Sequence, residues 1–112
     1  DVKGRTVILV DDGLASGLTA RAALEVIRKN KPAQTILAVP VAGPDISAAM
    51  LNWVDALVCV GTPPNFLFIN DWYAHFDDCS ESGVLKCLRA TRKYSGKKSR
   101  RAKWMCIRRQ TR

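Results

Sequence analysis

The sequence is poor in the residues that build metal and redox sites. It contains a single histidine, His75, and four cysteines, at positions 59, 79, 87 and 106. No two cysteines form a Cys-x-x-Cys pair, so a zinc site, which needs about four ligands at short spacing, is not expected from the protein side chains. Because disulfides belong to oxidising compartments, we expect reduced thiols in a cytoplasmic protein.

Long hydrophobic runs and the common nucleotide-binding loops are also missing. No stretch approaches the roughly 20 apolar residues that span a bilayer, and the charged first residues do not resemble a signal peptide. The chain has no Gly-Lys-Ser/Thr loop and no Gly-x-Gly-x-x-Gly motif. These absences disfavour ATP or GTP hydrolysis and dinucleotide binding, and we expect no membrane partner.

Acidic residues are absent from the last part of the chain. Residues 89–112 hold eleven of the 18 Lys and Arg residues and no Asp or Glu, whereas residues 1–88 are net acidic. We therefore predict two units, a folded domain over residues 1–88 and a basic tail over residues 89–112 that is disordered or weakly helical. Nucleic-acid binding by this tail is a less favoured alternative.

Three apolar runs alternate with helical patterns along the first 88 residues. The runs predict strands, at residues 6–11, 35–41 and 56–60. Helices are expected over residues 19–30 and 45–53 and from Ser80. The buried face predicted for the first helix consists of Ala20, Ala23, Leu24 and Ile27. This alternation favours an α/β fold, a Rossmann-like parallel sheet of about three strands with flanking helices.

Residues 7–19, VILVDDGLASGLT, contain the strongest chemical signal. The apolar run ends in Asp11 and Asp12, which places both at the carboxyl end of a strand, where open α/β sheets bind ligands. The small residues that follow allow backbone N–H groups to close around an anion at the N-terminus of the next helix. Two carboxylates beside an anion site indicate a ligand with hydroxyl groups next to its phosphate, such as ribose 5-phosphate.

At these residues the sequence resembles the type I phosphoribosyltransferases, whose signature is four apolar residues, two acids and a small-residue loop that ends in Gly-x-Thr. The stretches AVPVAGPD (38–45), VCVGTPPNF (58–66) and DWYAHF (71–76) resemble bacterial phosphoribosyltransferase-domain proteins of unassigned acceptor. The resemblance covers residues 5–88. It implies a fold that is the C-terminal half of such a domain, with strands four to six of a sheet ordered 3-2-1-4-5-6.

The resemblance also assigns roles to the motif. Asp11 and Asp12 are the expected catalytic residues, which hold the 2- and 3-hydroxyls of the ribose. The expected phosphate-binding residues follow them: Ala15, Ser16, Gly17, Leu18 and Thr19. The alternative is a plain strand–turn–helix in which Thr19 caps the helix.

The implied activity is that of a pentosyl glycosyltransferase of nucleoside metabolism. It transfers a phosphoribosyl group from phosphoribosyl pyrophosphate to an unknown nitrogenous acceptor, with Mg²⁺ as the cofactor. We expect the whole reaction in the intact protein and little or none in these 112 residues, which the resemblance makes half of a domain. A non-catalytic regulatory module that binds a nucleotide or ribose phosphate is the alternative function.

Two further expectations concern surfaces. Trp72, Tyr73 and Phe76 are expected to close the open end of the core, with stacking on the acceptor base as the alternative. In a sheet of three strands, the strand at residues 6–11 is left as an apolar edge, which favours pairing with another chain. We also expect that the protein can form a homodimer.

Overall fold

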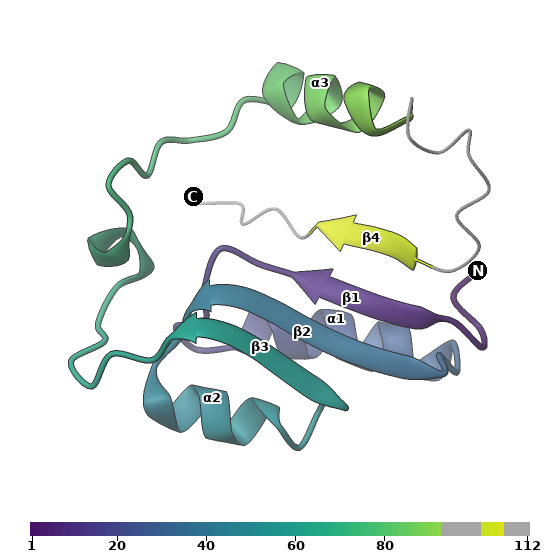
Figure 1. The fold of residues 1–112 in the computed structure, drawn as a ribbon, viewed down its shortest axis with the longest axis horizontal. Helices are drawn as coiled ribbons and strands as arrows, with labels where there is room; N and C mark the ends of the chain where they lie inside the picture. Colours follow the sequence, from purple (N-terminus) through teal and green to yellow (C-terminus); the bar gives the residue numbers. More distant parts are fainter. Residues whose placement is uncertain (93–101, 107–112) are drawn as a thin grey trace.

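A computed structural model describes the backbone of residues 1–92 and 102–106, and the side chains of residues 1–91. Its centre is a parallel sheet in the order β3-β2-β1-β4 (Figure 1). The three strands expected from the sequence are present with nearly the predicted bounds: β1 (Thr6–Val10), β2 (Gln34–Val41) and β3 (Ala56–Gly61). The α/β class and the parallel sheet are thus confirmed.

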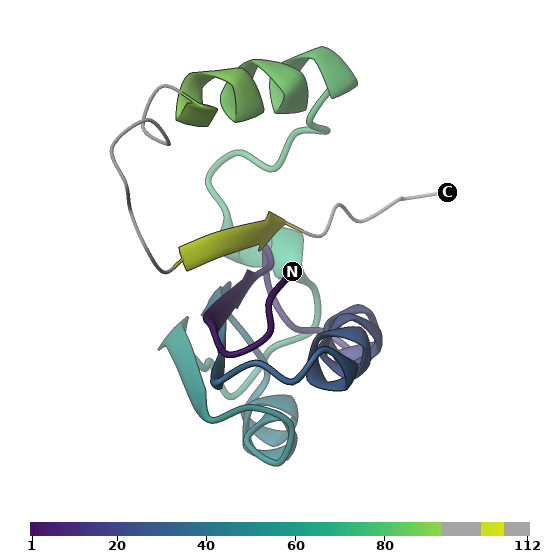
Figure 2. The same cartoon turned by 90° about the vertical axis from the view of Figure 1, so that its right-hand side faces the viewer.

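Two helices cover one face of this sheet. They are α1 (Leu18–Lys29), between β1 and β2, and α2 (Pro44–Met50), between β2 and β3. Both lie on the same side of the strands when the sheet is viewed edge-on (Figure 2). Consecutive parallel strands with right-handed crossovers put their helices on one side, which explains the layering.

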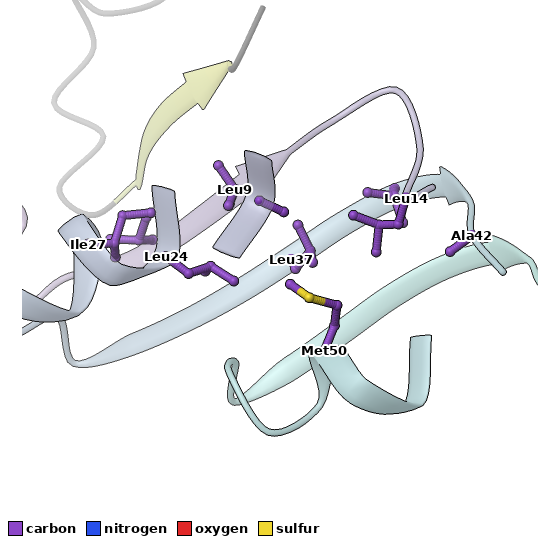
Figure 3. Close-up of a cluster of buried hydrophobic side chains, with 10 residues drawn as sticks. Leu9, Leu14, Leu24, Ile27, Leu37, Ala42 and Met50 are labelled. Carbon is purple, nitrogen blue, oxygen red and sulfur yellow. The ribbon is translucent and has the colours of Figure 1, made fainter. Parts of the chain in front are cut away.

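The core lies between the sheet and these helices (Figure 3). Alternate strand residues point into it, with Leu9 from β1 and Leu37 from β2 fully buried. Leu24 and Ile27 of α1 and Met50 of α2 pack against them. The helical face predicted from the sequence is confirmed, because its four members are all buried or packed on this core.

The opposite face of the sheet is open in the described part of the chain. Val60 is 87% exposed although it lies in an apolar strand. The last helix, α3 (Glu81–Arg92), follows a short 3₁₀ helix, η1 (Ile69–Trp72), and stands apart from the sheet (Figure 1). Two of its apolar residues, Leu85 and Leu88, are therefore more than half accessible to water.

Part of the basic tail forms a strand that the sequence pattern did not predict. Its residues Ala102–Cys106 form strand β4, which pairs in parallel with β1 from Thr6↔Ala102 to Val10↔Cys106. Helix α3 extends to Arg92, into the segment assigned to the tail. An unpaired strand edge presents a row of N–H and C=O groups, and this segment pairs with them, so β1 is not a sheet edge. The rest of the tail, residues 93–101 and 107–112, lies outside the described residues.

Candidate functional site

The predicted motif forms a tight turn at the carboxyl ends of β1 and β2. The backbone N–H of Asp11 donates to the Ala38 carbonyl at 3.3 Å, which continues the pairing one residue past the end of β1. Leu14 then returns to the sheet, where its N–H donates to the Val41 carbonyl at 3.0 Å. The turn is therefore held at both of its ends by main-chain bonds to β2.

Two glycines allow this turn to pack closely. Gly17 has a φ of 69°, in the left-handed region, and is the N-cap of α1. A Cβ there would lie 3.0 Å from Ile46 Cδ1 of α2. At Gly13 a Cβ would lie 3.0 Å from the Val41 carbonyl oxygen and from two carbons of Ile69. A Cβ at either position would require its neighbours to shift, which favours glycine at both.

The five predicted phosphate-binding residues gather around one small hollow at the start of α1. The hollow is lined by Asp11 and residues 13–20 and has a volume of about 10 Å³, room for one water-sized group. The Ser16 hydroxyl is exposed and accepts from the Leu18 N–H at 3.4 Å. Thr19 was a candidate helix cap, but α1 begins one residue before it and Gly17 occupies the cap position. The cap is left-handed, so glycine replaces the hydroxyl residue there.

The two acids are adjacent in sequence and differ in surroundings. Both are partly buried, and Asp11 Oδ1 accepts the backbone N–H of Asp12 at 3.0 Å. Asp12 Oδ1 is buried and has no hydrogen-bond partner within residues 1–91. Burying a carboxylate oxygen without a hydrogen-bond donor raises the free energy of the folded protein. This atom is therefore available to a donor from outside the described residues.

The aromatic segment meets the acidic turn, a contact that the sequence pattern did not reveal. The Tyr73 hydroxyl donates to the backbone carbonyl of Asp12 at 2.6 Å, across 61 positions of sequence. Burial raises the pKa of the Tyr73 phenol above its ordinary value, and the charges of Asp12 and Asp11 raise it further. In the sequence, the one feature that pointed to Tyr73 was its position in the stretch DWYAHF (71–76), which resembles the family.

The other aromatic residues do not close the core as expected. Trp72 and Phe76 remain 48% and 45% exposed, and Ile69 is the buried residue of this segment. The cause is the short 3₁₀ helix, which turns Ile69 toward Gly13 and leaves the rings at the surface. Phe76 instead contacts Tyr73, with 5.1 Å between ring centroids.

Comparison with known proteins identifies the family of this chain. A family model described as the phosphoribosyl transferase domain matches residues 1–74. The chain belongs to the phosphoribosyl transferase domain family.

Relatives support the same assignment. The chain is 38% identical over 85 residues to a Mycobacterium tuberculosis H37Rv protein named "Putative phosphoribosyl transferase", over 76% of this chain and 19% of that protein. A protein of the same description in strain CDC 1551 matches equally. A crystal structure of a Thermus thermophilus protein superposes with a TM-score of 0.72 at 34% identity, over 77% of this chain and 41% of that one. The chain therefore spans less than half of these relatives.

An apolar hollow lies beside the acidic turn of this phosphoribosyl transferase domain. It has a volume of about 520 Å³ and is formed by the carboxyl ends of β2 and β3 together with Trp72 and Tyr73. The Val60 side chain, exposed at 87%, and the half-exposed indole of Trp72 supply apolar surface. A hollow of this size is within the range of small-molecule sites.

The described part of the domain lacks two other features. It holds no group of three or more His, Cys, Asp or Glu side chains that could bind a metal ion. It also has no helix long and apolar enough to cross a membrane.

The guanidinium of Arg21, in the first turns of α1, lies 4.7 Å from the centroid of the Trp53 ring and stacks on it.

Proposed function

We propose that this domain binds phosphoribosyl pyrophosphate at the β1–α1 turn and that the intact protein transfers its phosphoribosyl group to a nitrogenous base. The observation that carries the proposal is the hollow at the start of α1, which shares Asp11 with the acidic pair. An anion site and two carboxylates within one turn match a sugar phosphate better than a simple anion. The chain spans 19% of its curated relatives, so the reaction is proposed for the intact protein.

The 5-phosphate binds at the hollow formed by residues 15–19. The first N–H groups of a helix have no acceptor within the helix, and the helix dipole favours an anion beside them. The Ser16 hydroxyl is exposed next to these groups and adds a donor to the phosphate. The closely packed glycines keep the main chain near the ligand, so the phosphate is recognised mostly by backbone atoms.

The ribose binds through Asp11 and Asp12. Ionised carboxylates accept hydrogen bonds from the 2- and 3-hydroxyls, and bonds with a charged acceptor are the stronger kind. The buried and unpartnered Asp12 Oδ1 supports this role, because a sugar hydroxyl supplies the donor that residues 1–91 do not. When pyrophosphate leaves C1, positive charge develops on the sugar, and two fixed carboxylates offset it.

Mg²⁺ is the proposed cofactor, and the two carboxylates of the turn are oxygen ligands of the kind that it prefers. Mg²⁺ is commonly held by one or two carboxylates together with substrate phosphates and water. The described residues offer the carboxylates of Asp11 and Asp12 and no complete protein cage. When bound with the substrate, Mg²⁺ neutralises part of the pyrophosphate charge.

The acceptor base occupies the apolar hollow between Val60 and Trp72. A planar heterocycle suits a site with an exposed aromatic face, and Tyr73, which lines the hollow, donates a hydrogen bond to the Asp12 carbonyl. This position supports attack of a ring nitrogen on C1 from the side of β2 and β3.

Calorimetry on the intact protein with phosphoribosyl pyrophosphate and Mg²⁺ tests the proposal. Binding that is weakened in both Asp11→Ala and Asp12→Ala supports it, and unchanged affinity in both variants contradicts it. Release of pyrophosphate in the presence of a panel of bases then tests transfer. Binding without turnover favours the second candidate, a regulatory module that holds a ribose phosphate. A cytoplasmic location and a homodimer stay predictions of the same proposal.

A further inference from the structure

Tyr73 reaches the acidic turn from a segment far along the chain. We propose that Tyr73 is a positioning residue for ribose recognition, because its hydroxyl fixes the Asp12 peptide and thereby the direction of the Asp12 carboxylate. This inference rests on the proposed function and names a residue outside the sequence motif. In ribose recognition Tyr73 acts through Asp12 and does not contact the sugar.

A short hydrogen bond joins Tyr73 to the main chain of Asp12. The Tyr73 phenol donates to the Asp12 carbonyl oxygen at 2.6 Å, and both residues are partly buried. A peptide group is planar, so holding its carbonyl oxygen restricts the backbone torsion of the residue that bears it. The direction of the Cα–Cβ bond of Asp12 follows from that torsion, and the carboxylate swings less than on a free loop.

A steric contact between Ile69 and Gly13 comes from the same segment. Ile69, four residues before Tyr73, approaches Gly13 so closely that a Cβ there would be 3.0 Å from its Cγ1 and Cγ2 atoms. The segment 69–73 thus holds the main chain at Asp12 and at the residue after it. The backbone is fixed on one side, while the Asp12 Oδ1 atom has no partner among residues 1–91. A fixed backbone and an available acceptor together form a preorganised site.

The Tyr73 phenol must be neutral to donate its hydrogen bond. A hydrogen-bond donor can serve beside two carboxylates only while it is protonated. Burial and the neighbouring acids raise the pKa of Tyr73 above its ordinary value, so the hydroxyl stays neutral throughout the physiological range. A lysine at this position would instead pair with the carboxylates and compete with the sugar. Tyrosine holds the turn and leaves both negative charges in place.

Tyr73→Phe in the intact protein tests the proposal, since it removes the hydroxyl and keeps the ring. We expect the affinity for ribose 5-phosphate, measured by calorimetry, to fall by about threefold to tenfold, the usual effect of one lost hydrogen bond. The affinity for inorganic phosphate is expected to stay unchanged, because the hollow at α1 is held by other contacts. An unchanged ribose 5-phosphate affinity, or an equal loss for both ligands, would overturn the positioning role.

A double-mutant comparison separates this inference from the proposed function. In an Asp12→Ala background, which has no side-chain acceptor to orient, Tyr73→Phe is expected to cause no further loss of ribose 5-phosphate affinity, whereas a full additional loss contradicts action through Asp12. Phe76→Leu is the matched control, because it removes the ring contact to Tyr73 and leaves the hydroxyl, and its affinity is expected to equal that of the wild type. If Asp11→Ala and Asp12→Ala both bind ribose 5-phosphate normally, the proposed function fails; if only Tyr73→Phe binds normally, this inference alone fails.

Discussion

The two halves of the candidate site are held in different ways. The phosphate half, residues 15–19, is fixed by shape, with Gly17 packed against Ile46 and its φ at 69°. The sugar half, Asp11 and Asp12, is fixed by hydrogen bonds, including the 2.6 Å bond from Tyr73. A turn that is held by close packing is disrupted by a substitution that adds atoms. Binding by a carboxylate is weakened by a substitution that removes the charge and keeps the size. The two halves should therefore respond to opposite kinds of substitution.

The largest effect is expected in the phosphate half. Gly17→Ala combines left-handed strain with a Cβ 3.0 Å from Ile46 Cδ1, and we expect a loss of about 3 kcal/mol in the free energy of unfolding. Denaturant titration measures it. Gly4→Ala is the matched control, because its φ is 66° and no atom lies within 4 Å of the added Cβ. A loss of about 1 kcal/mol is expected there, and equal losses in the two variants would show that packing does not hold the turn.

The second-largest effect is expected in the sugar half, on ligand affinity. Asp12→Asn keeps the size of the side chain and removes its charge, so we expect the affinity for ribose 5-phosphate to fall by about 10-fold to 100-fold. The affinity for inorganic phosphate should stay the same or rise, because a negative charge near the anion is gone. Asp45→Asn, at a solvent-accessible acid in the first turn of α2, is the control and should bind normally. Equal weakening of both ligands by Asp12→Asn would abolish the distinction between the halves.

A smaller effect links the sugar half to pH. The pKa of Tyr73 is raised in the folded protein by burial and by Asp12 and Asp11, relative to an unfolded value of about 10. The contribution of the neutral phenol to stability is therefore complete below about pH 10 and is lost as the pH rises through the folded pKa. We expect wild-type protein to lose more stability than Tyr73→Phe across this alkaline range in denaturant titrations. Parallel curves for the two proteins would contradict the raised pKa.

The smallest effect is expected at Ser16. Its hydroxyl accepts from the Leu18 N–H at a long 3.4 Å, so Ser16→Ala should cost less than about 1 kcal/mol of stability. The affinity for inorganic phosphate should fall only a few-fold, because backbone groups do most of the binding. Ser16→Thr retains the hydroxyl and should bind phosphate like the wild type. A loss in Ser16→Ala as large as in Gly17→Ala would make this half dependent on side chains.

Much of the fold was predictable because it depends on local patterns. The strand–helix alternation, the buried face of α1 with Leu24 and Ile27, and the position of the acids after β1 all follow from periodicity and turn chemistry. The tail was predicted less well. Pairing of Ala102–Cys106 with β1 depends on an available strand edge at the other end of the chain, which composition does not encode.

The amino-acid sequence by itself determined the class of fold, the family and the turn that places two carboxylates beside a helix N-terminus, because each depends on residues that are close neighbours in the chain. Only the tertiary structure decided that Tyr73 bonds the Asp12 carbonyl, that Ile69 packs on Gly13, and that one oxygen of Asp12 is buried without a donor among residues 1–91. These contacts join segments that are distant in sequence, and chain packing, which follows from the burial of the whole core, brings them together.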